Sequence, residues 1–104
     1  YDAKHEIVPI KTANNEPLAP ADVVGPVCES GDTFAHGISL PSLHPGDLLA
    51  IKTAGAYGAV MASTYNSRPL IPEVLVKGNS YSVVRPRQSY EDLIGSEIIA
   101  PWLT

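Results

Sequence analysis

The sequence lacks the features that mark membrane, metal-binding and nucleic-acid-binding proteins. No apolar run approaches the roughly 20 residues that a membrane-spanning helix needs. Basic residues are few, seven against 11 acids, and they are dispersed, so neither nucleic acid nor an anionic membrane is an expected partner. His5, His36 and His44 fit no metal-ligand spacing, and there is no P-loop, dinucleotide fingerprint or G-x-S-x-G motif. The sequence therefore gives no reason to expect a function that depends on any of these features.

Cysteine is almost absent as well, since Cys28 is the only one among 104 residues. One thiol cannot form an internal disulfide, and the N-terminus shows no signal-peptide pattern, so a reducing, cytoplasmic setting is the simplest interpretation. The chain begins at Tyr1 without an initiator methionine, and we expect it to be a fragment of a longer protein. A hydrophobic fraction of 44% excludes disorder, and the length fits one compact domain.

Proline and glycine, by contrast, are abundant, with ten and eight residues, and they interrupt the chain too often for long helices. Between them lie short runs rich in β-branched residues and tyrosine, which predict strands within residues 5–10, 21–27, 47–53, 57–63, 72–77 and 81–86. Strands separated by turn signals are typical of a sandwich or barrel. The expected class is one mostly β domain.

Local signals also predict two turns and one helix. Residues 45–47 form a Pro-Gly-Asp turn signal, and the Gly-Asn pair at 78–79 predicts the tip of a hairpin. The one good helix candidate is "SYEDLIG", near the C-terminus. Ser89 is the expected N-cap, Asp92 its capping-box partner and Gly95 the end of the helix.

Cys28 lies in the stretch "GPVCESGD", where turn formers and two acids replace the apolar surroundings of a packing cysteine. Thiols are mostly protonated at neutral pH and can give up a proton, so Cys28 is a candidate proton donor. Burial as a small hydrophobe is the usual fate of a free cysteine and stays open as the alternative. Glu29, beside the thiol, is a candidate to bind a cationic group of a substrate, whereas Asp32 fits a turn.

Tyr57 is the second candidate, because the small residues of "AGAYGA" let a ligand approach its backbone closely. Its phenol can hydrogen-bond a phosphate or carboxylate, and packing in a β core is the alternative. Arg68, in "YNSRP", can hold a carboxylate of a ligand or of the protein itself, and the structural use is the commoner one. A cysteine–histidine hydrolase has no support beyond the presence of both residue types.

Four blocks in order, "YDAKHEI", "VVGPVCESGD", "LHPGDLLAIKTAGAYG" and "STYNSRPLIPEVLV", resemble the C-terminal domain of the diaminopimelate decarboxylase family. That family belongs to the alanine-racemase-like, fold type III class of pyridoxal-phosphate enzymes. The resemblance covers nearly the whole chain, and "CESGD" with "YNSRP" favours this family over ornithine and arginine decarboxylases. It implies that residues 1–104 form a Greek-key β-barrel or sandwich with a short C-terminal helix. This would be the second domain of an enzyme whose (β/α)8 barrel is absent from the chain.

The resemblance also implies roles for individual residues. Cys28 matches the family's proton-donating cysteine, and Glu29 matches the carboxylate that binds the distal amino group of the substrate. Tyr57 matches a tyrosine that contacts the cofactor and lies close to the substrate. Tyr1 matches a tyrosine that contacts the substrate. No metal site is implied.

The implied reaction is the decarboxylation of meso-2,6-diaminopimelate to L-lysine and CO2, in lysine biosynthesis. The cofactor, pyridoxal 5'-phosphate, is expected on a lysine of the barrel domain, since no lysine of this chain lies in the family's cofactor-lysine motif. The chain alone is therefore expected to be inactive. Its expected partners are that barrel and a second subunit, in a homodimer with shared active sites. A related decarboxylase of another basic amino acid and a non-catalytic β assembly module remain as alternatives.

Overall fold

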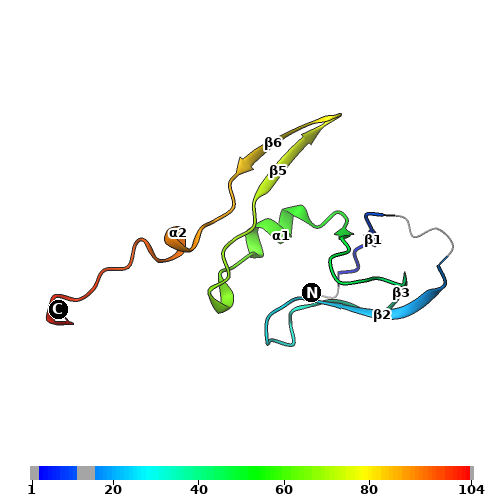
Figure 1. Cartoon of the computed structure of the whole chain (residues 1–104), viewed down its shortest axis with the longest axis horizontal. Coiled ribbons are helices and arrows are strands. Elements are labelled where there is room, and N and C mark those ends of the chain that lie inside the picture. The colour runs from blue at the N-terminus through cyan, green and yellow to red at the C-terminus, as the bar shows by residue number, and fades with distance from the viewer. Residues whose placement is uncertain (1–2, 12–15, 104) are drawn as a thin grey trace. The chain divides into compact units, whose positions relative to one another are not determined.

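The computed structural model describes residues 3–11 and 16–103, and the chain divides into two compact units, Tyr1–Met61 and Ala62–Thr104 (Figure 1). The first unit holds β1 (Ile7–Pro9), β2 (Leu18–Val24), β3 (Thr33–Pro41), β4 (Leu49–Ile51) and α1 (Gly55–Met61). The second holds the 3-10 turn η1 (Tyr65–Ser67), β5 (Glu73–Lys77), β6 (Ser80–Arg85), α2 (Tyr90–Ile94) and η2 (Pro101–Leu103). Within the described ranges the strands pair two by two, all antiparallel.

In the first unit, β1 pairs with β4, and the β2–β3 hairpin lies between them in the sequence. The ladder begins with Ile7 opposite Ile51, and beyond that pair the N–H of Lys52 extends it by donating to the carbonyl of Glu6 at 2.8 Å. The ammonium of Lys52 also lies 3.2 Å from the Glu6 carboxylate. The pairing joins residues at least 40 positions apart, so no local signal in the sequence could have predicted it.

Strand β3 is the longest in the described chain, and the sequence patterns above did not predict it. Its apolar residues do not alternate regularly, because the register with β2 shifts between Ala21 and Val23. Gly37 has a φ of +63°, in the left-handed region, and its N–H donates to the Asp22 carboxylate at 2.8 Å. The Asp22 carboxylate therefore stabilises the irregular register, and that register obscures the period-two pattern of an ordinary strand.

The strand predicted within residues 57–63 is wrong, because α1 occupies Gly55–Met61. Thr53, with a φ of +57°, turns the chain after β4, and the N–H of Gly58 then donates to the carbonyl of Ala54 at 2.8 Å. The small residues around Tyr57 offer no β-branched bulk to favour an extended chain. Alanine, moreover, is the strongest helix former.

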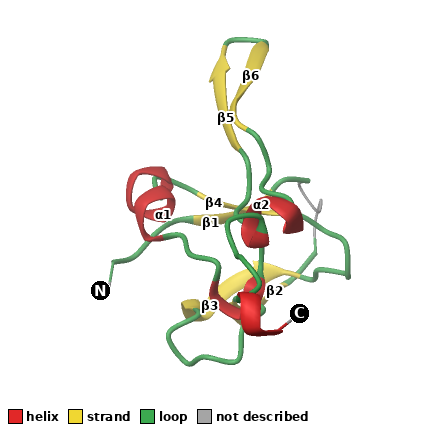
Figure 2. Cartoon of the chain, turned by 90° about the vertical axis from the view of Figure 1, so that its left-hand side faces the viewer, coloured by secondary structure: helices red, strands yellow, loops and turns green. Residues whose placement is uncertain are grey.

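The second unit contains the best-predicted elements. Strands β5 and β6 form a hairpin whose two-residue tip is Gly78-Asn79, as expected, with Lys77 opposite Ser80 (Figure 2). Helix α2 begins after Ser89, whose hydroxyl accepts from the N–H of Asp92 at 3.0 Å. The Asp92 carboxylate accepts in return from the N–H of Ser89 at 2.9 Å. The predicted capping box is thus confirmed.

The mostly β class with a short C-terminal helix is confirmed, although the strands of the described residues do not close into a barrel. Ile7 and Leu40, 8% and 5% exposed, are the buried apolar residues among those described. Many large apolar side chains of the described residues are exposed, in both units. Each unit thus leaves apolar surface that its own residues do not cover.

The Asp22 carboxylate gives the β2–β3 hairpin a predictable pH dependence. The hydrogen bond from the Gly37 N–H, and to a lesser degree the nearby His36, hold the pKa of Asp22 below its usual value of 3.8. A carboxyl whose pKa is lower in the folded chain stabilises it fully above the ordinary value, and loses that effect as pH falls through the lowered one. We expect NMR titration to show Asp22 titrating below 3.8, with the Gly37 amide shift following it. In Asp22→Asn the Gly37 shift should not titrate, and an Asp22 pKa at or above 3.8 would contradict the contact.

Candidate functional site

Cys28 and Glu29 lie in the loop that joins β2 to β3. The loop is closed at its base, where the Gly25 N–H donates to the carbonyl of Asp32 at 2.8 Å. Within it, the Asp32 N–H donates to the carbonyl of Glu29 at 3.0 Å, and the Val27 N–H donates to the Asp32 carboxylate at 3.0 Å. This network makes the loop a defined turn and not a loose connection.

The thiol of Cys28 is free and exposed, so it is not the packed hydrophobe that composition alone favoured. The next residue, Glu29, folds back so that its carboxylate accepts from the N–H of Gly31. Its other oxygen has only a long contact, 3.5 Å, with the hydroxyl of Ser30. A carboxylate has about four lone-pair positions, so Glu29 retains room for a cationic donor beside the thiol.

Tyr57 lies in α1, in the same unit as the loop, and is 74% exposed. A side-chain atom added to Gly55 or to Gly58 would meet nothing within 4 Å, so both flanks of the tyrosine are open. Its phenol makes no hydrogen bond with any residue that the structure describes. These features agree with a group that a ligand can reach, and they contradict packing in a β core.

Two other residues singled out by the sequence contribute less. Tyr1 lies outside the described residues. Arg68 belongs to the second unit, where its N–H donates to the carbonyl of Tyr65 at 3.4 Å and its side chain lines a shallow hollow with Arg87 and Tyr90. The structure thus places Arg68 directly after η1, within the second unit.

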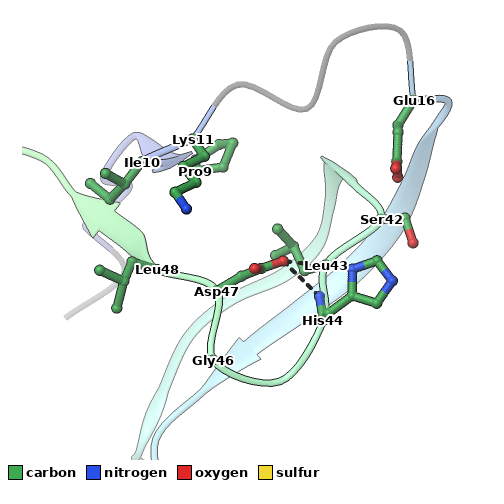
Figure 3. Close-up of a pocket in the computed structure, with 10 residues that line it drawn as sticks. All are labelled: Pro9, Ile10, Lys11, Glu16, Ser42, Leu43, His44, Gly46, Asp47 and Leu48. Atoms are coloured by element: carbon green, nitrogen blue, oxygen red, sulfur yellow. Dashed lines mark hydrogen bonds and ion pairs between the residues drawn. The ribbon is translucent and has the colours of Figure 1, made fainter.

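A hollow of about 250 Å³ lies in the first unit, beside the end of the β2–β3 pairing that is opposite to the Cys28 loop, and Figure 3 shows the residues that line it. Its polar lining includes Lys11, His44 and Asp47, and the Asp47 carboxylate accepts from the N–H of His44 at 2.8 Å. Neither Cys28 nor Tyr57 lines it. In residues 3–11 and 16–103 no three His, Cys, Asp or Glu side chains are grouped so that they could hold a metal ion. No helix of this part is long and apolar enough to cross a membrane.

Residues 1–55 match the family described as pyridoxal-dependent decarboxylase, C-terminal sheet domain, and the chain belongs to that family. Among curated relatives, the diaminopimelate decarboxylase of Zymomonas mobilis is 52% identical over 99% of this chain. That of Helicobacter pylori is 50% identical over 94% of the chain. The resemblance stated above is confirmed. The chain spans 24% of the length of each of these relatives.

Solved structures agree with the sequence relatives. A diaminopimelate decarboxylase from Helicobacter pylori complexed with L-lysine matches 91% of this chain at 48% identity, with a TM-score of 0.82. The chain covers 23% of that structure. One from M. jannaschii, also in complex with L-lysine, matches the whole chain at 36% identity, with a TM-score of 0.90, and the chain covers 24% of it.

The family is pyridoxal-dependent by its description, so the residues present can be tested against that cofactor. A thiol, a carboxylate and a phenol provide a proton and polar contacts. Of the three lysines of the first unit that the structure describes, Lys52 lies against Glu6, Lys11 lines the hollow of Figure 3, and Lys4 is exposed before β1. The donor set therefore fits contacts to one side of a pyridoxal phosphate and does not by itself hold it.

Proposed function

We propose that this chain is the C-terminal sheet domain of a diaminopimelate decarboxylase, which converts meso-2,6-diaminopimelate to L-lysine and CO2. The observation that carries the proposal is an exposed thiol with an adjoining carboxylate, on an ordered loop of a chain 52% identical to such an enzyme. Both structures compared above are complexes with L-lysine, the product of this reaction. The activity belongs to the whole two-domain enzyme, to which the chain contributes part of the site.

In this proposal Cys28 supplies the proton that completes the reaction. Pyridoxal phosphate, when bound, takes up the electron pair released as the α-carboxylate leaves as CO2. The bond from the α-carbon to the carboxylate breaks, and the thiol proton of Cys28 replaces CO2 on that carbon. The resulting thiolate regains its proton from solvent. An exposed thiol on a turn closed by main-chain hydrogen bonds suits this role.

Glu29 binds the far ammonium group of the substrate, at the end that does not react. Its side chain already accepts from the Gly31 N–H, which leaves the carboxylate held in place and still able to accept from a cation. A charge-assisted hydrogen bond of this kind is roughly twice as strong as a neutral one. Since Glu29 follows Cys28 directly, the carboxylate that binds the distal ammonium group and the thiol that donates the proton lie on the same turn.

The partners in this proposal are the barrel domain, which carries the cofactor lysine, and a second subunit in a homodimer. The relatives are about four times longer than this chain, which supports a preceding domain. The exposed apolar side chains of both units support contacts with the barrel domain and with a second subunit, because two-stranded pairs are only marginally stable alone. The enzyme is proposed to act in the cytoplasm.

Tyr57 is proposed to contact the cofactor and to lie beside the substrate. We expect Tyr57→Phe to lower kcat/KM by about 3- to 10-fold, because one neutral hydrogen bond contributes about 0.5–1.5 kcal/mol. Tyr81→Phe is the matched control, since that tyrosine is equally exposed, at 75%, on the β5–β6 hairpin. Steady-state kinetics measure both variants. Equal losses in the two, or none in either, would remove Tyr57 from the site.

The experiment that tests the proposal is a chimera, in which this chain replaces the matching segment of the Zymomonas mobilis enzyme. The chimera is loaded with pyridoxal phosphate and assayed for CO2 release from meso-diaminopimelate, ornithine and arginine. We expect release from meso-diaminopimelate alone. Release chiefly from ornithine or arginine would favour a related basic amino-acid decarboxylase. A folded, cofactor-loaded chimera that releases CO2 from none of them would favour a non-catalytic assembly module.

A further inference from the structure

Asp32 holds both neighbours of Cys28 in place. Its carboxylate accepts from the N–H of Val27, the residue before the thiol, at 3.0 Å. Its own N–H donates to the carbonyl of Glu29, the residue after the thiol, at 3.0 Å. Its carbonyl accepts from the N–H of Gly25 at 2.8 Å, which closes the base of the loop. One residue therefore anchors the main chain on each side of Cys28.

The loop is built around this carboxylate. A Cβ at residue 25 would overlap the side chain of Asp32. The Asp32 carboxylate therefore fits here only because residue 25 is a glycine. Asp32 is half-buried there, whereas Cys28 and Glu29 are exposed. The side chain that anchors the turn is thus shielded, and those with proposed contacts to the substrate face solvent.

We infer that Asp32, seated against Gly25, is a positioning residue that fixes the Cys28 thiol for proton transfer. The inference rests on the proposed function of Cys28 and adds a residue that does not touch the substrate. Eight residues join β2 to β3, and without an internal acceptor such a loop samples many conformations. A charge-assisted bond to the Val27 N–H restricts the residue next to the thiol most directly.

Loss of this anchor is expected to lower kcat more than it changes KM. A displacement of about 1 Å in a reacting group can cost about 100-fold in rate. In the chimera we therefore expect Asp32→Ala to lower kcat about 10- to 100-fold. Its solvent deuterium isotope effect on kcat should rise, since proton delivery becomes slower than the other steps. A general loss of stability would reduce the active fraction and leave that isotope effect unchanged.

Two further variants separate positioning from charge. Asp32→Asn keeps an oxygen that can accept from the Val27 N–H, so we expect it to retain most of the kcat that the alanine variant loses. Gly25→Ala leaves Asp32 intact but displaces its carboxylate, so we expect it to resemble Asp32→Ala. Asp47→Ala is the control, because Asp47 likewise accepts a main-chain N–H within a turn of the same unit, but far from the thiol in sequence. Its kcat should stay close to that of the unaltered chimera.

Amide hydrogen exchange of the peptide covering residues 25–32 tests the anchor without reference to activity. We expect exchange about 10-fold faster or more in Asp32→Ala, because a hydrogen bond to a charged group contributes about 1.5–3 kcal/mol. We expect a clearly smaller increase in Asp32→Asn, whose neutral amide oxygen can still accept from the Val27 N–H. Unchanged exchange in Asp32→Ala, or an unchanged kcat in an active chimera, overturns the inference. So does an asparagine variant as slow as the alanine one with its loop intact. If the unaltered chimera is inactive, the proposed function fails, and with it the claim that Asp32 positions Cys28 for proton transfer. The exchange data still show whether Asp32 anchors the loop.

Discussion

Replacing Cys28 with alanine is expected to lower kcat for meso-diaminopimelate by about 100- to 10,000-fold in the chimera, the range typical of losing a positioned acid or base. The methyl group of alanine cannot donate a proton to the α-carbon. The thiol is exposed and not packed, so its removal leaves no cavity in a core. The absorbance of the bound cofactor should therefore be retained while turnover is lost.

A loss of proton donation has to be distinguished from a loss of subunit assembly or cofactor binding. Subunit mass, cofactor absorbance and loop hydrogen exchange are measured on the same Cys28→Ala preparation. Cys28→Ser is the matched variant, because it preserves shape but replaces the thiol with a far weaker acid, and we expect it to be nearly as slow. Turnover within a few-fold of the unaltered chimera in both variants would remove the proton-donor assignment.

Glu29→Gln is expected to have the second-largest effect, a loss of about 10- to 150-fold in kcat/KM for meso-diaminopimelate. The amide is nearly the same size as the carboxylate and can still accept from the Gly31 N–H, so the turn should persist. What disappears is the charge that pairs with the distal ammonium, and hydrogen bonds to charged groups contribute about 1.5–3 kcal/mol.

Steady-state kinetics with meso-diaminopimelate measure this loss, and Glu97→Gln is the control, an exposed acid of the other unit. The Glu97 variant should match the unaltered chimera. An equal, small effect of the two substitutions would show that Glu29 does not contact the substrate. A large loss accompanied by faster exchange at residues 25–32 would instead assign Glu29 to the structure of the turn.

The elements that the sequence patterns predicted correctly are those governed by neighbouring residues. Ser89 and Asp92 satisfy each other's main-chain N–H groups within one helical turn, and Gly78-Asn79 supplies a two-residue hairpin tip. Strand β3 was missed because the bulge held by Asp22 and Gly37 breaks its alternation. Helix α1 was mistaken for a strand because its short run of small residues has no periodicity that distinguishes the two.

The candidate site shows the same division. Turn-forming residues around Cys28 were enough to predict a loop there, and the structure adds that the thiol is exposed. The close approach of the Asp32 carboxylate to Gly25 depends on the conformation of the seven peptide units between them, and residue spacing alone does not predict that conformation. The fold of Glu29 back onto Gly31 is likewise a property of the closed turn. Sequence patterns therefore predicted the residues with proposed contacts to the substrate but not the residue that holds them.

The most direct test of the central claim is the rate of CO2 release from meso-diaminopimelate by the cofactor-loaded chimera, compared with the same chimera carrying Cys28→Ala. We expect turnover comparable to that of the Zymomonas mobilis enzyme in the first, with L-lysine as the product, and near-complete loss in the second with cofactor still bound. Equal rates in the two, or no release from a correctly assembled, cofactor-loaded chimera, would contradict it.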